Sequence, residues 1–89
     1  MAERIVDEFE MRGFVLDHTV QILEIPDSST TGTYRSRVLY QDQETLGSGF
    51  ECGYDDSKIP RSKALGQYKA QLITFLEGVD IVTPERRGR

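Results

Sequence analysis

The residues that could do chemistry are few and far apart along the chain. His18 is the single histidine and Cys52 the single cysteine, so a zinc site would need carboxylates from distant segments. Cys52 follows Glu51, whereas a nucleophilic thiolate is stabilised by a basic neighbour. We therefore predict no metal site, and we interpret Cys52 as a core thiol and His18 as a strand-edge or partly buried side chain.

Two other segments have residue types that occur in binding sites. The pair Asp55-Asp56 could bind a cation, but a helix-capping turn explains both residues. The run Gly47-Ser48-Gly49 lacks the Lys and Ser/Thr of a phosphate-binding loop and precedes a predicted strand. General acid-base catalysis needs groups that converge, and this sequence does not supply them. We therefore predict a protein that is not an enzyme, with no cofactor and no small-molecule substrate.

Length and composition indicate one small globular domain. The chain has 89 residues, of which 37% are hydrophobic and 29% are charged. We expect a domain over residues 1–83, followed by a disordered basic tail over residues 84–89. The acidic N-terminus does not resemble a signal peptide, and no apolar run is long enough to span a membrane. These features predict a cytoplasmic protein with no membrane partner.

The pattern of apolar residues predicts an α+β fold. It has a three-stranded antiparallel sheet with two helices packed on one face, in the order α-β-β-β-α. The last helix carries an apolar stripe of residues three and four positions apart, which would cover the sheet and which consists of Leu65, Tyr68, Leu72, Phe75 and Leu76. The predicted helices are Glu3–Arg12 and Pro60–Glu77, and the predicted strands are His18–Ile25, Thr33–Gln41 and Leu46–Tyr54.

Several details of this pattern allow alternatives. Glu3–Arg12 also alternates as a strand would. The alternation in the first predicted strand slips at Ile22-Leu23, which indicates either a bulge or a strand covered on both faces. The loop Pro26–Gly32 is too long for a tight hairpin turn. Asp56 or Ser57 is expected to cap the last helix.

Charge is divided unevenly between the two parts of the chain. Residues 1–56 have a balance of −8 and residues 57–89 a balance of +4, which gives the net charge of −4. Arg35 and Arg37 share the face of the sheet that the predicted helices leave open. They either pair with Glu51 or Glu44 across the strands, or form a contact patch for an acidic partner or a second copy.

Three motifs in order resemble the double-stranded RNA-binding domain, over roughly Ile5 to Leu76. Tyr34 stands at the aromatic position that opens the second strand of that family. Leu46-Gly47-Ser48-Gly49 is similar to its glycine element, and Arg61-Ser62-Lys63 to its lysine motif. The resemblance implies the α-β-β-β-α fold and contact between the start of the last helix and duplex RNA phosphates. Ala64 departs from this pattern, because the family has a second lysine there.

Two functions follow as hypotheses. The first is a small interaction module whose partner is another protein or a second copy, bound through the sheet face of Arg35 and Arg37 or through an edge strand. The second is binding to duplex RNA or another structured nucleic acid, since affinity for phosphates rises with the number of cations that contact them. The cations and polar groups predicted to make these contacts are Lys58, Arg61, Ser62, Lys63 and Lys69.

Overall fold

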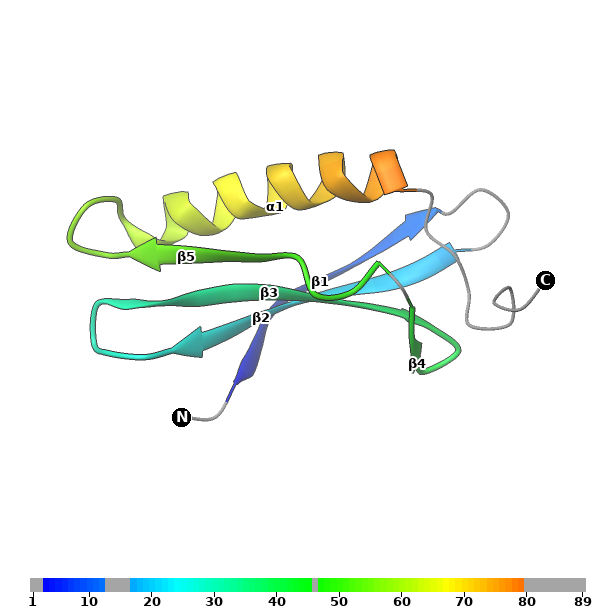
Figure 1. Cartoon of the computed structure of the whole chain (residues 1–89), viewed down its shortest axis with the longest axis horizontal. Helices are drawn as coiled ribbons and strands as arrows, with labels where there is room; N and C mark the ends of the chain where they lie inside the picture. The colour runs from blue at the N-terminus through cyan, green and yellow to red at the C-terminus, as the bar shows by residue number, and fades with distance from the viewer. Residues whose placement is uncertain (1–2, 13–16, 46, 80–89) are drawn as a thin grey trace.

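The computed structural model describes residues 3–12, 17–45 and 47–79 (Figure 1). This is an α+β arrangement, but the predicted order α-β-β-β-α is wrong, because the described chain begins with a strand and the sheet has more than three strands. The predicted tail, residues 84–89, lies outside the described residues. The elements are β1 (Arg4–Arg12), β2 (Asp17–Pro26), β3 (Thr31–Tyr40), β4 (Gln43–Glu44), β5 (Glu51–Asp55) and α1 (Arg61–Val79).

The segment predicted as the first helix, Glu3–Arg12, forms strand β1 instead. It pairs antiparallel with β2, and the register shifts at a bulge between Ile5 and Asp7. The bulge adds a residue, so Val6 and Phe9 both pack against the core. Val6 and Phe9 are three positions apart, which is the spacing of residues on one face of a helix, although the rest of the strand alternates as a regular strand does.

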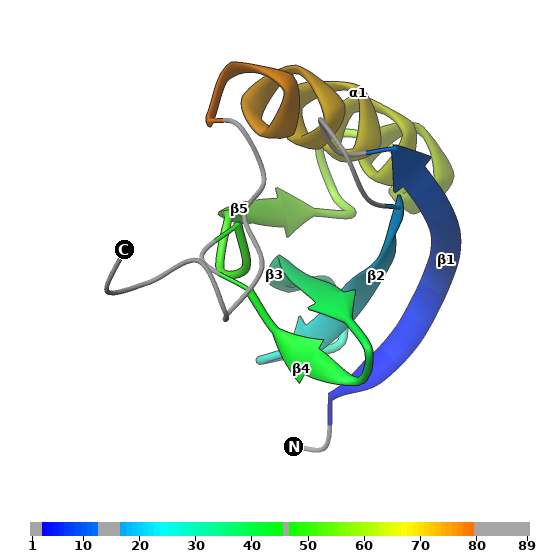
Figure 2. The ribbon, with the colours of Figure 1, turned by 90° about the vertical axis from the view of Figure 1, so that its right-hand side faces the viewer.

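The strands form one curved antiparallel sheet. They run in the order β1-β2-β3-β4, and β5 pairs with β3 beside β4. Figure 2 shows β1 curling up one side of the molecule toward α1, while β5 lies on the other side. In the described part of the chain α1 alone covers the concave face, so the prediction of two helices on one face is wrong.

The predicted third strand, Leu46–Tyr54, is divided into a turn and the shorter strand β5. Leu46 lies outside the described residues. Gly49 has a φ of 99°, a left-handed conformation that glycine adopts without strain. Its N–H donates a hydrogen bond to the carbonyl of Ser36 at 2.9 Å. The chain therefore pairs with β3 at β4, bends at Gly49 while it stays bonded to Ser36 of β3, and pairs with β3 again at β5.

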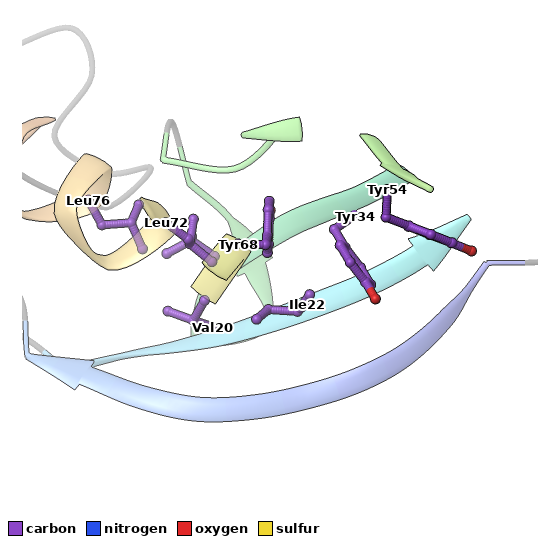
Figure 3. Close-up of a cluster of buried hydrophobic side chains, with 8 residues drawn as sticks. Val20, Ile22, Tyr34, Tyr54, Tyr68, Leu72 and Leu76 are labelled. Atoms are coloured by element: carbon purple, nitrogen blue, oxygen red, sulfur yellow. The ribbon is translucent and has the colours of Figure 1, made fainter. Parts of the chain in front are cut away.

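The core lies between the concave face of the sheet and α1 (Figure 3). Tyr68, Leu72 and Leu76 of the predicted apolar stripe are buried, which confirms the face that the helix turns toward the sheet. Leu65 is half-buried, and Phe75, at the outer border of the stripe, is 36% exposed. The buried sheet residues that complete this cluster are Val20, Ile22, Tyr34, Val38 and Tyr54.

The helix begins after Pro60, whose carbonyl accepts hydrogen bonds from two first-turn N–H groups, both at 3.0 Å. The prediction that Asp56 or Ser57 caps α1 is therefore wrong. Ser57 belongs to an earlier turn, in which its N–H and its hydroxyl donate to the Asp55 carboxylate at 3.0 and 2.6 Å. Within the described residues, no helix is long and apolar enough to cross a membrane.

The β2–β3 hairpin is tighter than the sequence predicts. The N–H of Asp27 donates to the carbonyl of Thr31 at 3.1 Å, so the turn closes within a few residues. Gly32 follows this turn in β3 and is buried against Tyr54 of β5. The backbones of three strands and one aromatic ring meet at this glycine.

We expect Gly32→Ala to lower the free energy of unfolding by about 1–3 kcal/mol, because overpacking forces a shift. A methyl group here would lie 2.6 Å from Cζ of Tyr54 and 2.8 Å from the carbonyl oxygen of Ile25. Chemical denaturation followed by circular dichroism measures the loss. Gly53→Ala is the matched control, since its methyl group meets its nearest atom at an ordinary 3.6 Å. Equal stability of the two variants would contradict this expectation.

Candidate functional site

A buried carboxylate on β2 joins four elements of the fold. The side chain of Glu24 is 3% exposed. Its Oε1 accepts a hydrogen bond from Nε of Arg4 on β1 at 3.1 Å. Its Oε2 accepts from the hydroxyl of Tyr54 on β5 at 2.7 Å and from Nη1 of Arg61 on α1 at 3.1 Å. Glu24 therefore fixes the start of α1 against the sheet.

The contacts of Glu24 decide its ionisation and that of Tyr54. Burial raises the pKa of the Glu24 carboxyl, but the hydrogen bond from Tyr54 and the guanidinium groups of Arg4 and Arg61 outweigh burial, and the pKa is lowered overall. Burial and the hydrogen bond to Glu24 raise the pKa of Tyr54 to about 12. Near neutral pH the cluster thus contains an ionised Glu24 and a protonated Tyr54 hydroxyl. The sequence signal for Glu24 was its position two residues after Ile22 in the alternation of β2.

Arg61, a predicted nucleic-acid contact, points back onto the protein. Besides Glu24, it reaches the carboxylate of Asp56 at 3.5 Å and the carbonyl of Ser29 at 3.2 Å. Its guanidinium lies 5.1 Å from the centre of the Tyr54 ring, which adds a cation–π contact. Arg61 therefore has a structural role at the start of α1.

The other four predicted contacts lie on different sides of α1. Lys69 pairs with Asp7 of β1 at 3.1 Å and lies over the ring of Phe9. Lys58 precedes the helix and is exposed, and Ser62 and Lys63 are exposed in its first turn. The structure brings Ser62 beside Arg61, whereas Lys69 contacts the opposite edge of the sheet from β5.

Arg35 and Arg37 lie on the convex face of β3, away from α1. Arg35 pairs with Glu51 at 3.3 Å, and Arg37 pairs with Glu44 at 3.5 Å. Arg37 also pairs with Glu3 at 3.0 Å. The cross-strand pairing that the sequence offered as one alternative is thus present. Both guanidinium groups are about one-third exposed, so these surface pairs contribute little to stability.

His18 is buried, whereas Cys52 is exposed. His18 is 2% exposed on β2, and its ring lies 5.6 Å from that of Tyr40. Cys52 is exposed on β5, so its interpretation as a core thiol is wrong. The reason is that β5 is an edge strand, which leaves one side of Cys52 uncovered by described residues. Among the described residues, no three His, Cys, Asp or Glu side chains gather as metal ligands.

The backbone groups of β5 alternate between its two edges. Phe50 accepts a hydrogen bond from β3 at 3.1 Å, and Asp56 donates one to Thr30 at 2.7 Å. In an antiparallel ladder every second residue bonds to the same neighbour. The N–H and C=O groups of Glu51 and Gly53 therefore point outward, where no described strand pairs with them. We call these four groups the β5 edge.

A hollow of about 140 Å³ lies between this edge and α1, and we call it the β5–α1 groove. Its wall on α1 has no charge, because the helix residues that line it are Ala64, Gln67, Tyr68 and Gln71. This spacing of uncharged residues was a signal that the sequence analysis missed. Asp55 and Lys58, the charged lining residues, both belong to the end of β5 or the turn after it. The other lining residues are Tyr34, Cys52, Gly53, Tyr54 and Ile59.

A second hollow, of about 430 Å³, lies on the other side of the start of α1. Arg4, Arg61 and Glu24 line it together with Ile5 and Leu65. Both guanidinium groups already bind the Glu24 carboxylate. This second hollow is therefore the solvent side of the Glu24 cluster, and the β5–α1 groove is the better candidate for a binding site.

Fold and site together define an α+β protein in which a curved antiparallel sheet is covered by a C-terminal helix. Within the described residues, its sheet ends at an unpaired edge beside that helix. Comparison with protein-family models, with curated proteins and with solved structures finds no match. Binding to duplex RNA consequently stays a prediction that depends on the sequence motifs.

Proposed function

We propose that this protein is a non-enzymatic interaction module that binds an extended polypeptide segment as an additional strand on the β5 edge. The observation that carries the proposal is the juxtaposition of the β5 edge with the β5–α1 groove. An added strand bonds to the backbone groups of Glu51 and Gly53, and its alternate side chains enter the groove. Main-chain bonds supply affinity in this mode, and the groove supplies selectivity.

The groove favours an apolar side chain on the bound segment. Tyr34, Tyr54 and Tyr68 provide buried aromatic surface, and Ile59 provides an apolar side chain that is 36% exposed. Burying an exposed apolar group of this kind stabilises a complex in proportion to the area removed from water. The segment is therefore expected to carry an apolar residue where its chain passes the middle of β5.

The outer edge of β1 fits an added strand less well than β5. Charges on an edge strand oppose pairing with a second strand, and five of the nine β1 residues are charged. The β1 bulge also interrupts the regular spacing of its backbone groups. By contrast, the middle of β5, Cys52-Gly53-Tyr54, is uncharged.

The proposal is tested with a phage-displayed library of random short peptides, selected on the immobilised full chain. Peptides that are selected should bind Gly53→Pro at least about tenfold more weakly than wild type. Proline removes the outward N–H of residue 53 and places its ring where the added strand would lie, while the bonds of β5 to β3 use other residues. Fluorescence anisotropy measures the affinities.

Gly53→Ala is the control in this experiment, because it keeps the N–H and its methyl group makes an ordinary contact. It should bind the selected peptides as wild type does. Circular dichroism and thermal unfolding show whether the proline variant remains folded. Equal binding by a folded proline variant, or failure to select any peptide on a chain that is monomeric, would refute the proposed function.

A further inference from the structure

We infer that the strand bound at the β5 edge is β5 of a second copy, paired antiparallel about a two-fold axis that passes beside Cys52. The inference rests on the proposed function, because it names the partner of the same edge. Two identical strands can add to each other only in a few registers. The two strands bond only where residues whose N–H and C=O groups point away from β3, such as Glu51 and Gly53, lie opposite each other.

Charge disfavours the register centred on Gly53. In that register Glu51 of each copy lies directly opposite Asp55 of the other, at both ends of the pairing. Like charges directly opposite each other across strands are destabilising. Two such pairs would form, and no cation of β5 would lie between them, since the strand contains none.

The register centred on Tyr54 loses backbone bonds. It requires Asp55 as an outward-facing partner, but the Asp55 carbonyl already accepts hydrogen bonds from Lys58 and Ile59 at 3.0 and 3.1 Å. The chain also turns at this point, so the residues after Asp55 do not continue the edge. This register therefore offers fewer bonds than a regular pair of strands.

The register centred on Cys52 avoids both difficulties. Glu51 then lies opposite Gly53 of the second copy, and the two residues exchange backbone hydrogen bonds on each side of the axis. Phe50 lies opposite Tyr54, which forms an aromatic pair across the strands. Phe50 remains in line with β5, because its carbonyl still accepts a bond from β3 at 3.1 Å.

The helices agree with this arrangement. A two-fold axis perpendicular to the sheet places both α1 helices on the same face, one on each side of the new strand pair. In this arrangement the uncharged residues Gln67 and Gln71 of each helix lie on the side of α1 that is nearer to the other copy. Depletion of charge is typical of the centre of an interface. Two exposed apolar residues flank this region, Ile59 in the groove and Phe75 stacked on Phe50 with ring centres 4.8 Å apart.

Sedimentation equilibrium of the full chain tests the inference. We expect a concentration-dependent dimer for wild type and Gly53→Ala, and a monomer for Gly53→Pro. Added salt should strengthen the dimer, because each copy has a formal charge of −4 and salt screens the repulsion between copies. A dimer that persists in folded Gly53→Pro would overturn the inference.

The single cysteine reports the register. In a non-hydrogen-bonded pair the two Cα atoms lie about 4.5 Å apart, within the range of a disulfide. With oxidised glutathione, two Cys52 thiols form a disulfide, and the glutathione disulfide takes their two electrons and two protons and leaves as two thiols. Covalent dimer should form at least about tenfold faster than in Cys52→Ser, Ser62→Cys, which carries an exposed thiol away from the groove.

The two proposals fail in different ways. A monomeric wild type that still binds selected peptides at the β5 edge would overturn self-pairing and leave the proposed function standing. Loss of both properties would overturn the proposed function as well. Equal crosslinking by the two single-cysteine proteins would overturn the register centred on Cys52.

Discussion

Glu24→Ala is expected to lower the free energy of unfolding by about 3 kcal/mol or more at neutral pH, the usual effect of removing one partner from a buried ion pair. The variant leaves the buried Tyr54 hydroxyl without its acceptor, and it leaves Arg4 and Arg61 without the carboxylate that binds them. Urea denaturation followed by circular dichroism measures the change. Glu77→Ala is the matched control, since Glu77 is exposed on α1 and should change stability by less than about 0.5 kcal/mol.

Acidification provides a second readout of the same contacts. The pKa of Glu24 is lower in the folded protein than its ordinary value of 4.5, so the unfolded chain binds this proton more readily. The stabilisation is complete above pH 4.5 and is lost as the pH falls through the lowered pKa. The stability difference between wild type and Glu24→Ala should therefore shrink in acid. A difference below about 1 kcal/mol at neutral pH, or one that grows in acid, would contradict this role.

Leu72→Ala is expected to lower the free energy of unfolding by about 2–5 kcal/mol, as for other buried leucines. Leu72 is fully buried and lies in the middle of α1, between Tyr68 and Leu76 (Figure 3). Truncation leaves a cavity at the contact between α1 and the sheet, which the rigid β2–β3 pair is poorly placed to fill. Chemical denaturation measures the loss.

The control for this prediction is the neighbouring helix position. Gln71→Ala changes an exposed residue and should alter stability by less than about 0.5 kcal/mol. If Leu72→Ala behaved as Gln71→Ala does, then α1 would not be held by the apolar stripe. The arrangement of the β5–α1 groove would then need another explanation.

The elements predicted correctly are those with a pattern inside their own segment. β2, β3 and α1 lie close to their predicted ranges, because alternating branched residues and a three-and-four spacing are properties of short stretches. The slip at Ile22-Leu23 also has its explanation here. Both residues are buried, so β2 is covered on both faces at this point, and the bulge belongs to β1.

The first element was mispredicted because a bulge altered its pattern. Val6 and Asp7 together oppose one residue of β2, so Val6 and Phe9 share a face although they are three positions apart, and the apolar residues of the segment do not alternate along its whole length. Helix and strand were both compatible with the local sequence, and pairing with β2 decided between them. In the same way, the edge position of β5, and with it the exposure of Cys52, depends on which strands pair and which do not.

By itself the sequence determined an α+β composition, the central strands and the buried face of the last helix, since each depends on neighbours a few positions away. Only the tertiary structure decided that Arg61 binds Glu24 and that the middle of β5 faces outward beside α1. The physical reason is that these features arise from contacts between segments far apart in the chain. Glu24 meets Arg4, Tyr54 and Arg61 only once the sheet has curved and the helix has crossed it.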